Sequence, residues 1–157
     1  MPNSSVNHYY SNIYHKYWSQ KRPANYSNSA YDLFLLSLIP SSKRLLLDAC
    51  IGNGIPYSRH LANLGHTVHG FDISDSLVSQ ANTISPQIRA VQSDIYSFTS
   101  NLDYDLVYIF HSLHALPNPY LALKTLLSNI PHARSFLIEF PSIYNTYNCS
   151  NFYKREQ

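Results

Sequence analysis

The sequence predicts a doubly wound α/β fold, in which helices cover both faces of a mostly parallel sheet of about five strands. From residue 44 onward, short apolar runs alternate with segments of helical spacing, a pattern typical of parallel strands joined by crossover helices. All four glycines of the 157-residue chain lie between residues 52 and 70, around the end of the first run. With 45% hydrophobic and 13% charged residues, the chain has enough apolar side chain to fill a core.

Two helices are predicted ahead of the first strand. Apolar residues at helical spacing indicate a Tyr-rich amphipathic helix over residues 6–18, which we interpret either as a lid over a binding site or as a helix packed on the sheet. A second helix follows and is stopped by Pro40. Its predicted apolar face consists of Tyr31, Phe34, Leu35 and Leu38.

The rest of the chain alternates strands and helices. Strands are expected at residues 44–50, 67–72, 88–92, 104–110 and 135–140. Helices are expected at residues 56–64 and 74–83, and a further one is expected to begin at Pro119 with Asn118 as its cap. We expect one domain over residues 1–157, made of N-terminal helices (1–40), a core (41–140) and an irregular tail (141–157).

Composition narrows the function classes. The net charge of +2 comes from 11 basic and 9 acidic residues, so the charge pattern does not favour a nucleic-acid partner. The longest apolar stretch, residues 33–39, is too short to cross a bilayer, so no membrane partner is expected. Two cysteines are too few for a disulfide framework, and no metal site is predicted. We therefore expect a cytoplasmic protein.

Three acidic residues mark successive strand ends. Asp48 lies near the end of the first predicted strand, Asp72 ends the second and Asp94 follows the third. In a doubly wound sheet, ligands bind beyond the carboxyl ends of the strands, where the strand order reverses. An Asp at such a position can also simply cap the next helix, and that alternative stays open. The positions nevertheless favour a binding site.

A glycine turn, Gly52-Asn53-Gly54, follows the first strand and lets a ligand approach bare backbone. The third glycine of the NAD fingerprint would fall at Tyr57, whose ring would block the close approach, so a dinucleotide is disfavoured. Asp72 comes 18 residues after Gly54, a suitable distance for a carboxylate that binds ribose hydroxyls. The expected ligand is a nucleoside without a pyrophosphate.

The same motifs resemble a known family over about residues 30–140. They are LLLDACIGNG at 45–54, GFDIS at 70–74, QSDI at 92–95, YDLV at 104–107 and LHALPNP at 113–119. Their order and spacing resemble class I S-adenosylmethionine-dependent methyltransferases of the small-molecule type. The resemblance implies a Rossmann-like sheet with strand order 3-2-1-4-5 and S-adenosylmethionine as cofactor.

The resemblance also implies roles for particular residues. In that family the glycine loop holds the methionine part of the cofactor, while the acids at the positions of Asp72 and Asp94 bind the ribose hydroxyls and the adenine amino group. Ile73 and Ile95 would flank the ring. The implied cofactor-binding set is Asp48, Ala49, Cys50, Gly52, Gly54, Asp72, Ile73, Asp94, Ile95 and Phe110.

Two departures from the family pattern bear on function. Cys50 stands where the family has its first glycine, which could crowd the methionine end. The family sheet usually has seven strands, whereas only five are predicted here, so we expect a homodimer, a partner subunit or the tail to cover the edge of the fifth strand, on which Glu139 is the one charge. The alternative function is a catalytically silent cofactor-binding scaffold or allosteric subunit.

Methyl transfer requires alignment of the two reactants, exclusion of water and, for some acceptors, a base. His111 and His114 follow the fourth predicted strand at the mouth of the expected site, so they are the candidate bases. For His114 a structural role in the turn is the preferred interpretation, because the family that the motifs resemble often has a histidine there. The expected acceptor is a small molecule.

Overall fold

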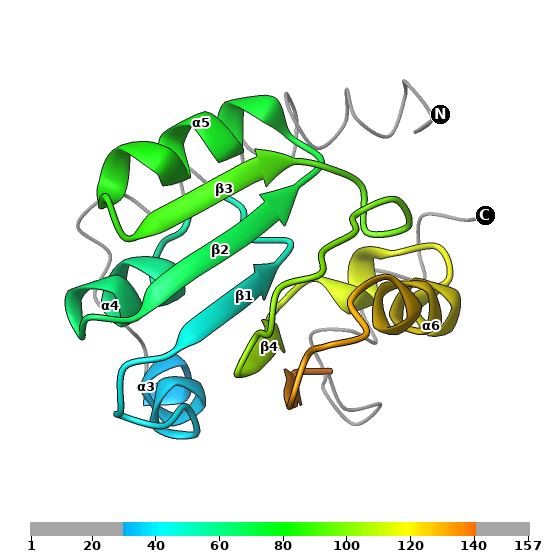
Figure 1. The fold of residues 1–157 in the computed structure, drawn as a ribbon. Helices are drawn as coiled ribbons and strands as arrows, with labels where there is room; N and C mark the ends of the chain where they lie inside the picture. The colour runs from blue at the N-terminus through cyan, green and yellow to red at the C-terminus, as the bar shows by residue number, and fades with distance from the viewer. Residues whose placement is uncertain (1–29, 141–157) are drawn as a thin grey trace.

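The computed structural model describes residues 30–140 and contains a five-stranded parallel sheet (Figure 1). Its strands are β1 (Leu45–Ala49), β2 (Thr67–Asp72), β3 (Ile88–Gln92), β4 (Leu106–Ile109) and β5 (Phe136–Ile138). The strand order is β3-β2-β1-β4-β5, which confirms the predicted topology. The predicted helix at 6–18 and the tail at 141–157 lie outside the described residues.

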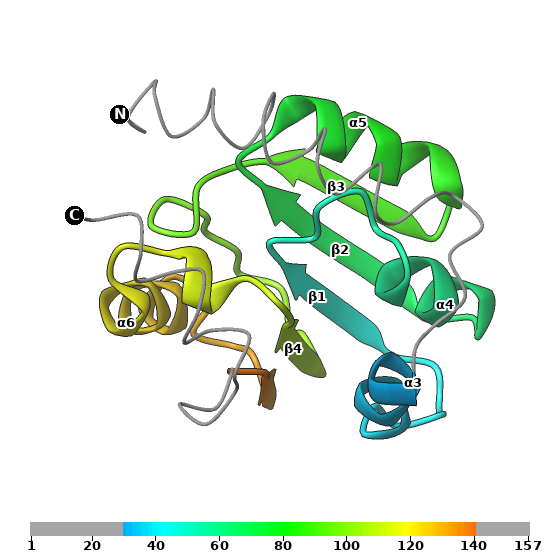
Figure 2. The same cartoon turned by 180° about the vertical axis from the view of Figure 1, so that it is seen from behind.

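Helices and a short 3-10 turn connect the strands (Figures 1 and 2). They are α3 (Ala30–Ser37), α4 (Tyr57–Asn63), α5 (Asp75–Ile84), η2 (Leu113–Ala115) and α6 (Pro119–Asn129). The Ser74 side chain caps α5 by accepting from the Leu77 N–H, and Asn118 caps α6 by accepting from the Leu121 N–H. The Asn118 cap was expected from the sequence.

The sheet buries one apolar cluster on each face because successive side chains of a strand point to opposite sides. Leu46 and Tyr108 join the cluster beneath α3, α4 and α5. Leu47 and Val107 join the cluster beneath α6 and the connection between β3 and β4. The four side chains are fully buried. This double cover leaves the carboxyl ends of the strands as the edge at which loops can form a site.

The buried face of α3 differs from the predicted one. Leu35 is buried as expected, but Tyr31, Phe34 and Leu38 are each about half exposed. Asp32 is instead only 1% exposed. From the hydrophobic pattern of the helix, an acidic residue is expected to be exposed. The Asp32 carboxylate instead points inward and contacts polar partners from distant parts of the chain.

The sheet reverses its order between β1 and β4, because β2 and β3 extend from one side of β1 and β4 and β5 from the other. Among the described residues, β5 pairs only with β4. Glu139, the one charge of the predicted fifth strand, is 9% exposed, and its carboxylate is directed inward and accepts from the His111 N–H. No helix within residues 30–140 is long and apolar enough to cross a membrane.

Candidate functional site

The glycine turn after β1 contains two residues with left-handed backbone. Gly52 and Gly54 have φ angles of 58° and 75°, which glycine adopts without steric penalty. A Cβ on Gly54 would lie 3.1 Å from the Ile84 side chain, whereas a Cβ on Gly52 would meet nothing within 4 Å. The turn therefore packs against α5 at Gly54 and presents open space at Gly52.

Cys50 adopts the conformation that a glycine would favour at this position, with φ of 66°. Left-handed backbone is uncommon for a residue with a Cβ and costs about 1–2 kcal/mol. Burial raises the pKa of the Cys50 thiol well above its usual value, and the charges of Asp72, Asp48 and Asp94 raise this pKa further. The thiol is therefore neutral. Despite the strain, the backbone at Cys50 keeps the left-handed conformation that a glycine would favour at this position of the turn.

Asp72 ties the end of β2 to the glycine turn. Its Oδ2 accepts from the Gly52 N–H at 2.9 Å, and its Oδ1 accepts from the Ser74 N–H at 3.0 Å. Burial raises the pKa of Asp72, while the backbone N–H donors of Ser74, Gly52 and Ile73 oppose that rise. Because a carboxylate accepts about four hydrogen bonds, these contacts leave capacity for a ligand.

Asp94 follows β3 on the same edge. Its Oδ1 accepts from the Tyr96 N–H at 3.0 Å, which orients the carboxylate in the loop. Ile73 is half-buried beside Asp72, whereas Ile95 is 4% exposed and packs into the cluster on the α6 face. The structure thus brings Asp72 and Asp94 to neighbouring strand ends, since β2 and β3 pair along their length.

Other members of the implied cofactor set are directed into the protein. Asp48 is 6% exposed and accepts hydrogen bonds from Ser58 Oγ at 2.5 Å and Tyr108 OH at 3.0 Å. Burial raises the pKa of Asp48 to about 7. Ala49 is fully buried, and the Phe110 ring packs between Tyr57 and Tyr108 at centroid distances of 4.8 and 5.1 Å. Asp48, Ala49 and Phe110 therefore pack in the interior and stabilise the residues that surround the site.

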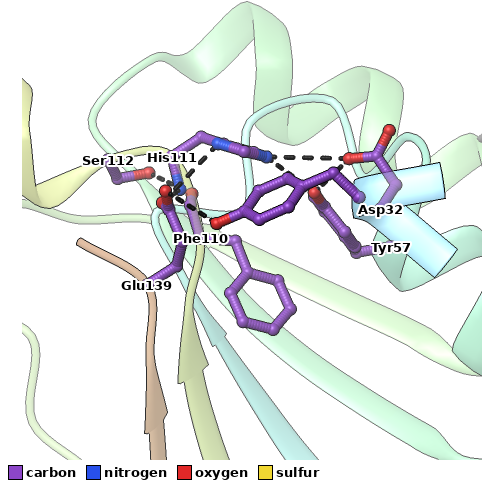
Figure 3. Close-up of polar contacts among 7 residues, drawn as sticks. Asp32, Tyr57, Phe110, His111, Ser112 and Glu139 are labelled. Atoms are coloured by element: carbon purple, nitrogen blue, oxygen red, sulfur yellow. Dashed lines mark hydrogen bonds and ion pairs between the residues drawn. The ribbon is translucent and has the colours of Figure 1, made fainter. Parts of the chain in front are cut away.

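His111 lies immediately beyond β4 in a polar cluster that joins four segments (Figure 3). Its Nε2 lies 2.7 Å from Tyr57 OH, and Tyr57 OH donates to Asp32 Oδ1. His111 Nε2 also lies 3.6 Å from Asp32 Oδ1. Asp32 belongs to α3 and Tyr57 to α4, so the cluster links both helices to the end of β4.

Glu139, just after β5, approaches His111 from the other side (Figure 3). Its Oε2 accepts from the His111 backbone N–H at 2.7 Å and lies 3.5 Å from His111 Nδ1. Its Oε1 accepts from Tyr31 OH at 3.3 Å. His111 itself has φ of 55°, a left-handed conformation that is rare outside glycine and frequent at functional sites.

His114 lies in η2, three residues further on. Burial lowers the pKa of His114, the charge of Glu139 raises it and the charge of His111 lowers it. Within residues 30–140, no group of three or more His, Cys, Asp or Glu side chains is arranged to hold a metal ion.

The sequence did not indicate that Asp32, Tyr57 or Glu139 would meet His111. Asp32 and Tyr57 are separated from His111 by 79 and 54 positions, and no motif connects them. Tyr57 was interpreted as a bulky ring that disfavours a dinucleotide, with no polar role. The signals that could have pointed to these residues are the acid within the apolar helix α3 and the acid at the end of β5.

Comparison with known proteins identifies the family. A family model described as a methyltransferase domain matches residues 46–130, which is more than half of the chain. Comparison with curated protein sequences gives no significant match.

Solved structures with a similar fold include the magnesium protoporphyrin IX methyltransferase of Synechocystis PCC 6803 with bound S-adenosylmethionine, at 19% identity and a TM-score of 0.70, covering 89% of this chain and 76% of that one. A TehB-like S-adenosylmethionine-dependent methyltransferase of Corynebacterium glutamicum is 21% identical with a TM-score of 0.64, covering 89% and 75%. The sugar N-methyltransferase KedS8 of a Streptoalloteichus species is 17% identical with a TM-score of 0.59, covering 77% and 50%.

The sheet order, the glycine turn, the acid that ends β2 and the acid that follows β3 define a class I methyltransferase fold. The chain belongs to the methyltransferase domain family and is an S-adenosylmethionine-dependent enzyme of that class.

Proposed function

We propose that the chain transfers the methyl group of S-adenosylmethionine to a small-molecule acceptor at the carboxyl edge of the sheet, next to the reversal between β1 and β4. The observation that carries the proposal is the Asp72 carboxylate, which holds the glycine turn through the Gly52 N–H and keeps capacity for further hydrogen bonds. Such a carboxylate suits a pair of ribose hydroxyls.

The residues present fit this cofactor by their chemistry. Asp72 would accept from the ribose hydroxyls, and Asp94 would accept from the adenine amino group. The open side of Gly52 would receive the methionine end, because nothing lies within 4 Å of the position of a Cβ there. The cofactor carries the activated methyl group, so the protein supplies orientation and excludes water.

The acceptor's proton also needs a destination when a hydroxyl or an amine is methylated. Of the two candidate histidines, His111 has the contacts of an oriented base, because Tyr57 and Glu139 fix its ring from two sides. For His114 we retain the structural role, since it lies within the short η2 turn.

Calorimetric titration with S-adenosylhomocysteine tests the cofactor assignment. The full chain is expected to bind it with one saturable site, and Asp72→Ala should weaken binding by about 10- to 150-fold, which corresponds to the roughly 1.5–3 kcal/mol of hydrogen bonds to a charged group. Asp75→Ala is the matched control, because Asp75 is an exposed acid in the first turn of α5.

Equal affinities for the wild type and Asp72→Ala would remove Asp72 from the cofactor site. Binding of NAD without a response to S-adenosylhomocysteine would refute the proposal itself. Cofactor binding with no methyl transfer to any acceptor would instead support the catalytically silent alternative.

A further inference from the structure

We propose that Asp48 is a neutral carboxylic acid in the protein without cofactor, and that it gives up its proton when S-adenosylmethionine binds but keeps it when S-adenosylhomocysteine binds. This inference rests on the proposed function and adds a way for the site to distinguish the positively charged sulfonium of the cofactor from the neutral thioether of the product. Asp48 would be a positioning residue, because it acts through its charge and not through contact with the reacting atoms.

Three side-chain oxygens form a closed triangle at the end of β1, which we call the Asp48 triangle. Ser58 Oγ lies 2.5 Å and Tyr108 OH lies 3.0 Å from Asp48 Oδ2, and the two hydroxyl oxygens lie 3.0 Å from each other. Asp48 is 6% exposed, while Ser58 and Tyr108 are fully buried. Within the described residues, the three side chains make no hydrogen bonds other than these. The protons of the triangle can therefore be counted.

The neutral carboxyl fits this triangle better than the carboxylate does. In the ionised state the two hydroxyls have one proton each, and both protons point to Asp48 Oδ2. Ser58 Oγ and Tyr108 OH then face each other at 3.0 Å with no proton between them. A protonated Asp48 supplies the third proton, so that each of the three oxygens donates once and accepts once. All three contacts then become hydrogen bonds, and an unmade hydrogen bond is costly in a buried site.

The surroundings of Asp48 also favour the neutral form. In the described part of the chain, the groups that face it are Ser58 of α4, Tyr108 of β4, Asp72 at the end of β2 and Cys50 of the turn, and none of these is a cation. Burial keeps Tyr108 and Cys50 protonated, since it raises both pKa values well above their usual range. Burial raises the pKa of Asp48 to about 7, the two hydroxyls oppose this rise, and the charge of Asp72 adds to it. A positive charge that arrives with a ligand would therefore ionise Asp48.

Asp48 is close enough to the glycine turn to respond to a charge there. The turn follows β1 directly, and the charges of Asp72, Asp48 and Asp94 all raise the pKa of Cys50 within it. Asp72 also accepts from the Gly52 N–H of the same turn. The proposed function places the methionine part of the cofactor on the open side of Gly52. The sulfonium would then come near the same group of acids.

The coupling between ligand charge and Asp48 acts in both directions. A cation near a buried carboxyl favours the ionised form, and by linkage the ionised Asp48 strengthens the binding of the cation. Methyl transfer leaves the sulfur as a neutral thioether, so Asp48 takes up a proton from water and the product loses this attraction. Asp48 would therefore favour the exchange of product for new cofactor.

Infrared difference spectroscopy of the full chain with carbon-13-labelled aspartate tests the neutral acid without any ligand. A protonated carboxyl has a carbonyl band that is separate from the bands of a carboxylate. At pH 6 the wild type should show such a band, and Asp48→Asn should lack it. Tyr108→Phe provides a second assignment, because it removes one hydrogen bond to Asp48 and should shift the band, while its aromatic ring can still pack on Phe110.

Calorimetry in two buffers of different ionisation enthalpy counts the protons released when a ligand binds. S-adenosylmethionine and S-adenosylhomocysteine are compared at pH 6 with no methyl acceptor present. With a pKa of about 7, about nine in ten Asp48 side chains hold the proton at pH 6, so lowering this pKa by one unit releases about 0.4 proton for each molecule bound. The wild type should release at least this much more with S-adenosylmethionine than with S-adenosylhomocysteine. The difference should vanish in Asp48→Asn and persist in Asp75→Asn, since Asp75 is an exposed acid of α5.

Three results would overturn the proposal. The first is an ionised Asp48 at pH 6 without cofactor, the second is equal proton release by the two compounds in the wild type, and the third is an undiminished difference in Asp48→Asn. Failure of both compounds to bind would refute the proposed function and with it the proton release. The infrared band tests the neutral Asp48 independently of that failure, because it is measured without ligand.

Discussion

Replacing Asp48 by asparagine should remove a pH-dependent loss of stability that the wild type carries. Burial raises the pKa of Asp48 from 3.8 to about 7, although Ser58 and Tyr108 both donate to the carboxylate. Because the folded pKa lies above the unfolded one, the folded state binds the proton more tightly. Stability is therefore lost as the pH rises from about 4 and the loss is complete above about 7.

The size of the effect follows from the two pKa values. Linkage at pKa 3.8 unfolded and about 7 folded gives a penalty of about 1.7 kcal/mol at pH 5 and about 4.3 kcal/mol at pH 8, so about 2.6 kcal/mol is lost between them. The amide side chain of the Asp48→Asn variant has no proton to exchange in this range. Its carbonyl can accept from Ser58 and Tyr108, and any penalty from its NH₂ group is the same at both pH values.

Urea denaturation at pH 5 and pH 8 measures this difference. The wild type should lose about 2.6 kcal/mol more between the two pH values than Asp48→Asn does, while the exposed control Asp75→Asn should follow the wild type. Parallel pH dependences of the wild type and Asp48→Asn would show that the Asp48 carboxyl titrates at its ordinary pKa. The argument from burial would then fail.

Further predictions concern the turn, the core and the sheet edge. Cys50→Gly should raise stability by up to about 1 kcal/mol in urea denaturation, because relief of left-handed strain exceeds the added entropy of the unfolded glycine; a lower midpoint would contradict this. Gly70→Ala should destabilise by about 1–3 kcal/mol, since the new Cβ would lie 2.9 Å from Ile51 Cβ; an unchanged melting temperature would exclude the clash. Tyr108→Phe should reduce stability by about 1.5–3 kcal/mol at pH 8, where Asp48 is mostly ionised, and by less at pH 5; equal losses at the two pH values in urea denaturation would contradict this. The full chain should either associate in light scattering or lack full activity because β5 is an edge strand among the described residues, and a monodisperse monomer with full methyl-transfer activity would contradict this.

The regular part of the fold was predictable because local signals and burial agree there. The strands predicted at 67–72 and 88–92 coincide with β2 and β3, since β-branched or apolar residues are bounded by turn residues on both sides. The start of α6 was equally clear, because Asn118 and Pro119 mark a helix N-terminus.

The polar cluster was not predictable because it depends on tertiary contacts. Asp32 lies in a helix that is apolar on several sides, so spacing alone placed Tyr31 and Phe34 on the inner face instead. Its burial is explained by Tyr57 and His111, which reach it from α4 and from the end of β4. A pattern within one element carries no information on such partners.

The sequence predicted where the candidate cofactor residues lie relative to the strands, and their contacts with the cofactor stay a prediction. Gly52, Asp72 and Asp94 lie on the strand ends where the sequence placed them. Asp48 and Phe110 were assigned to the cofactor by resemblance, but their side chains contact the interior of the protein. The sequence indicates which residues follow a strand, whereas the side of the sheet that each one faces depends on packing.

The most direct test of the central claim is a crystal structure of the full chain with S-adenosylhomocysteine. The account predicts that the ligand lies across the carboxyl ends of β1, β2 and β3, with ribose hydroxyls on Asp72, the adenine amino group on Asp94 and the homocysteine part over Gly52. Its sulfur should point toward the end of β4, where His111 lies. Occupancy elsewhere, or a ligand that contacts neither carboxylate, would contradict the account.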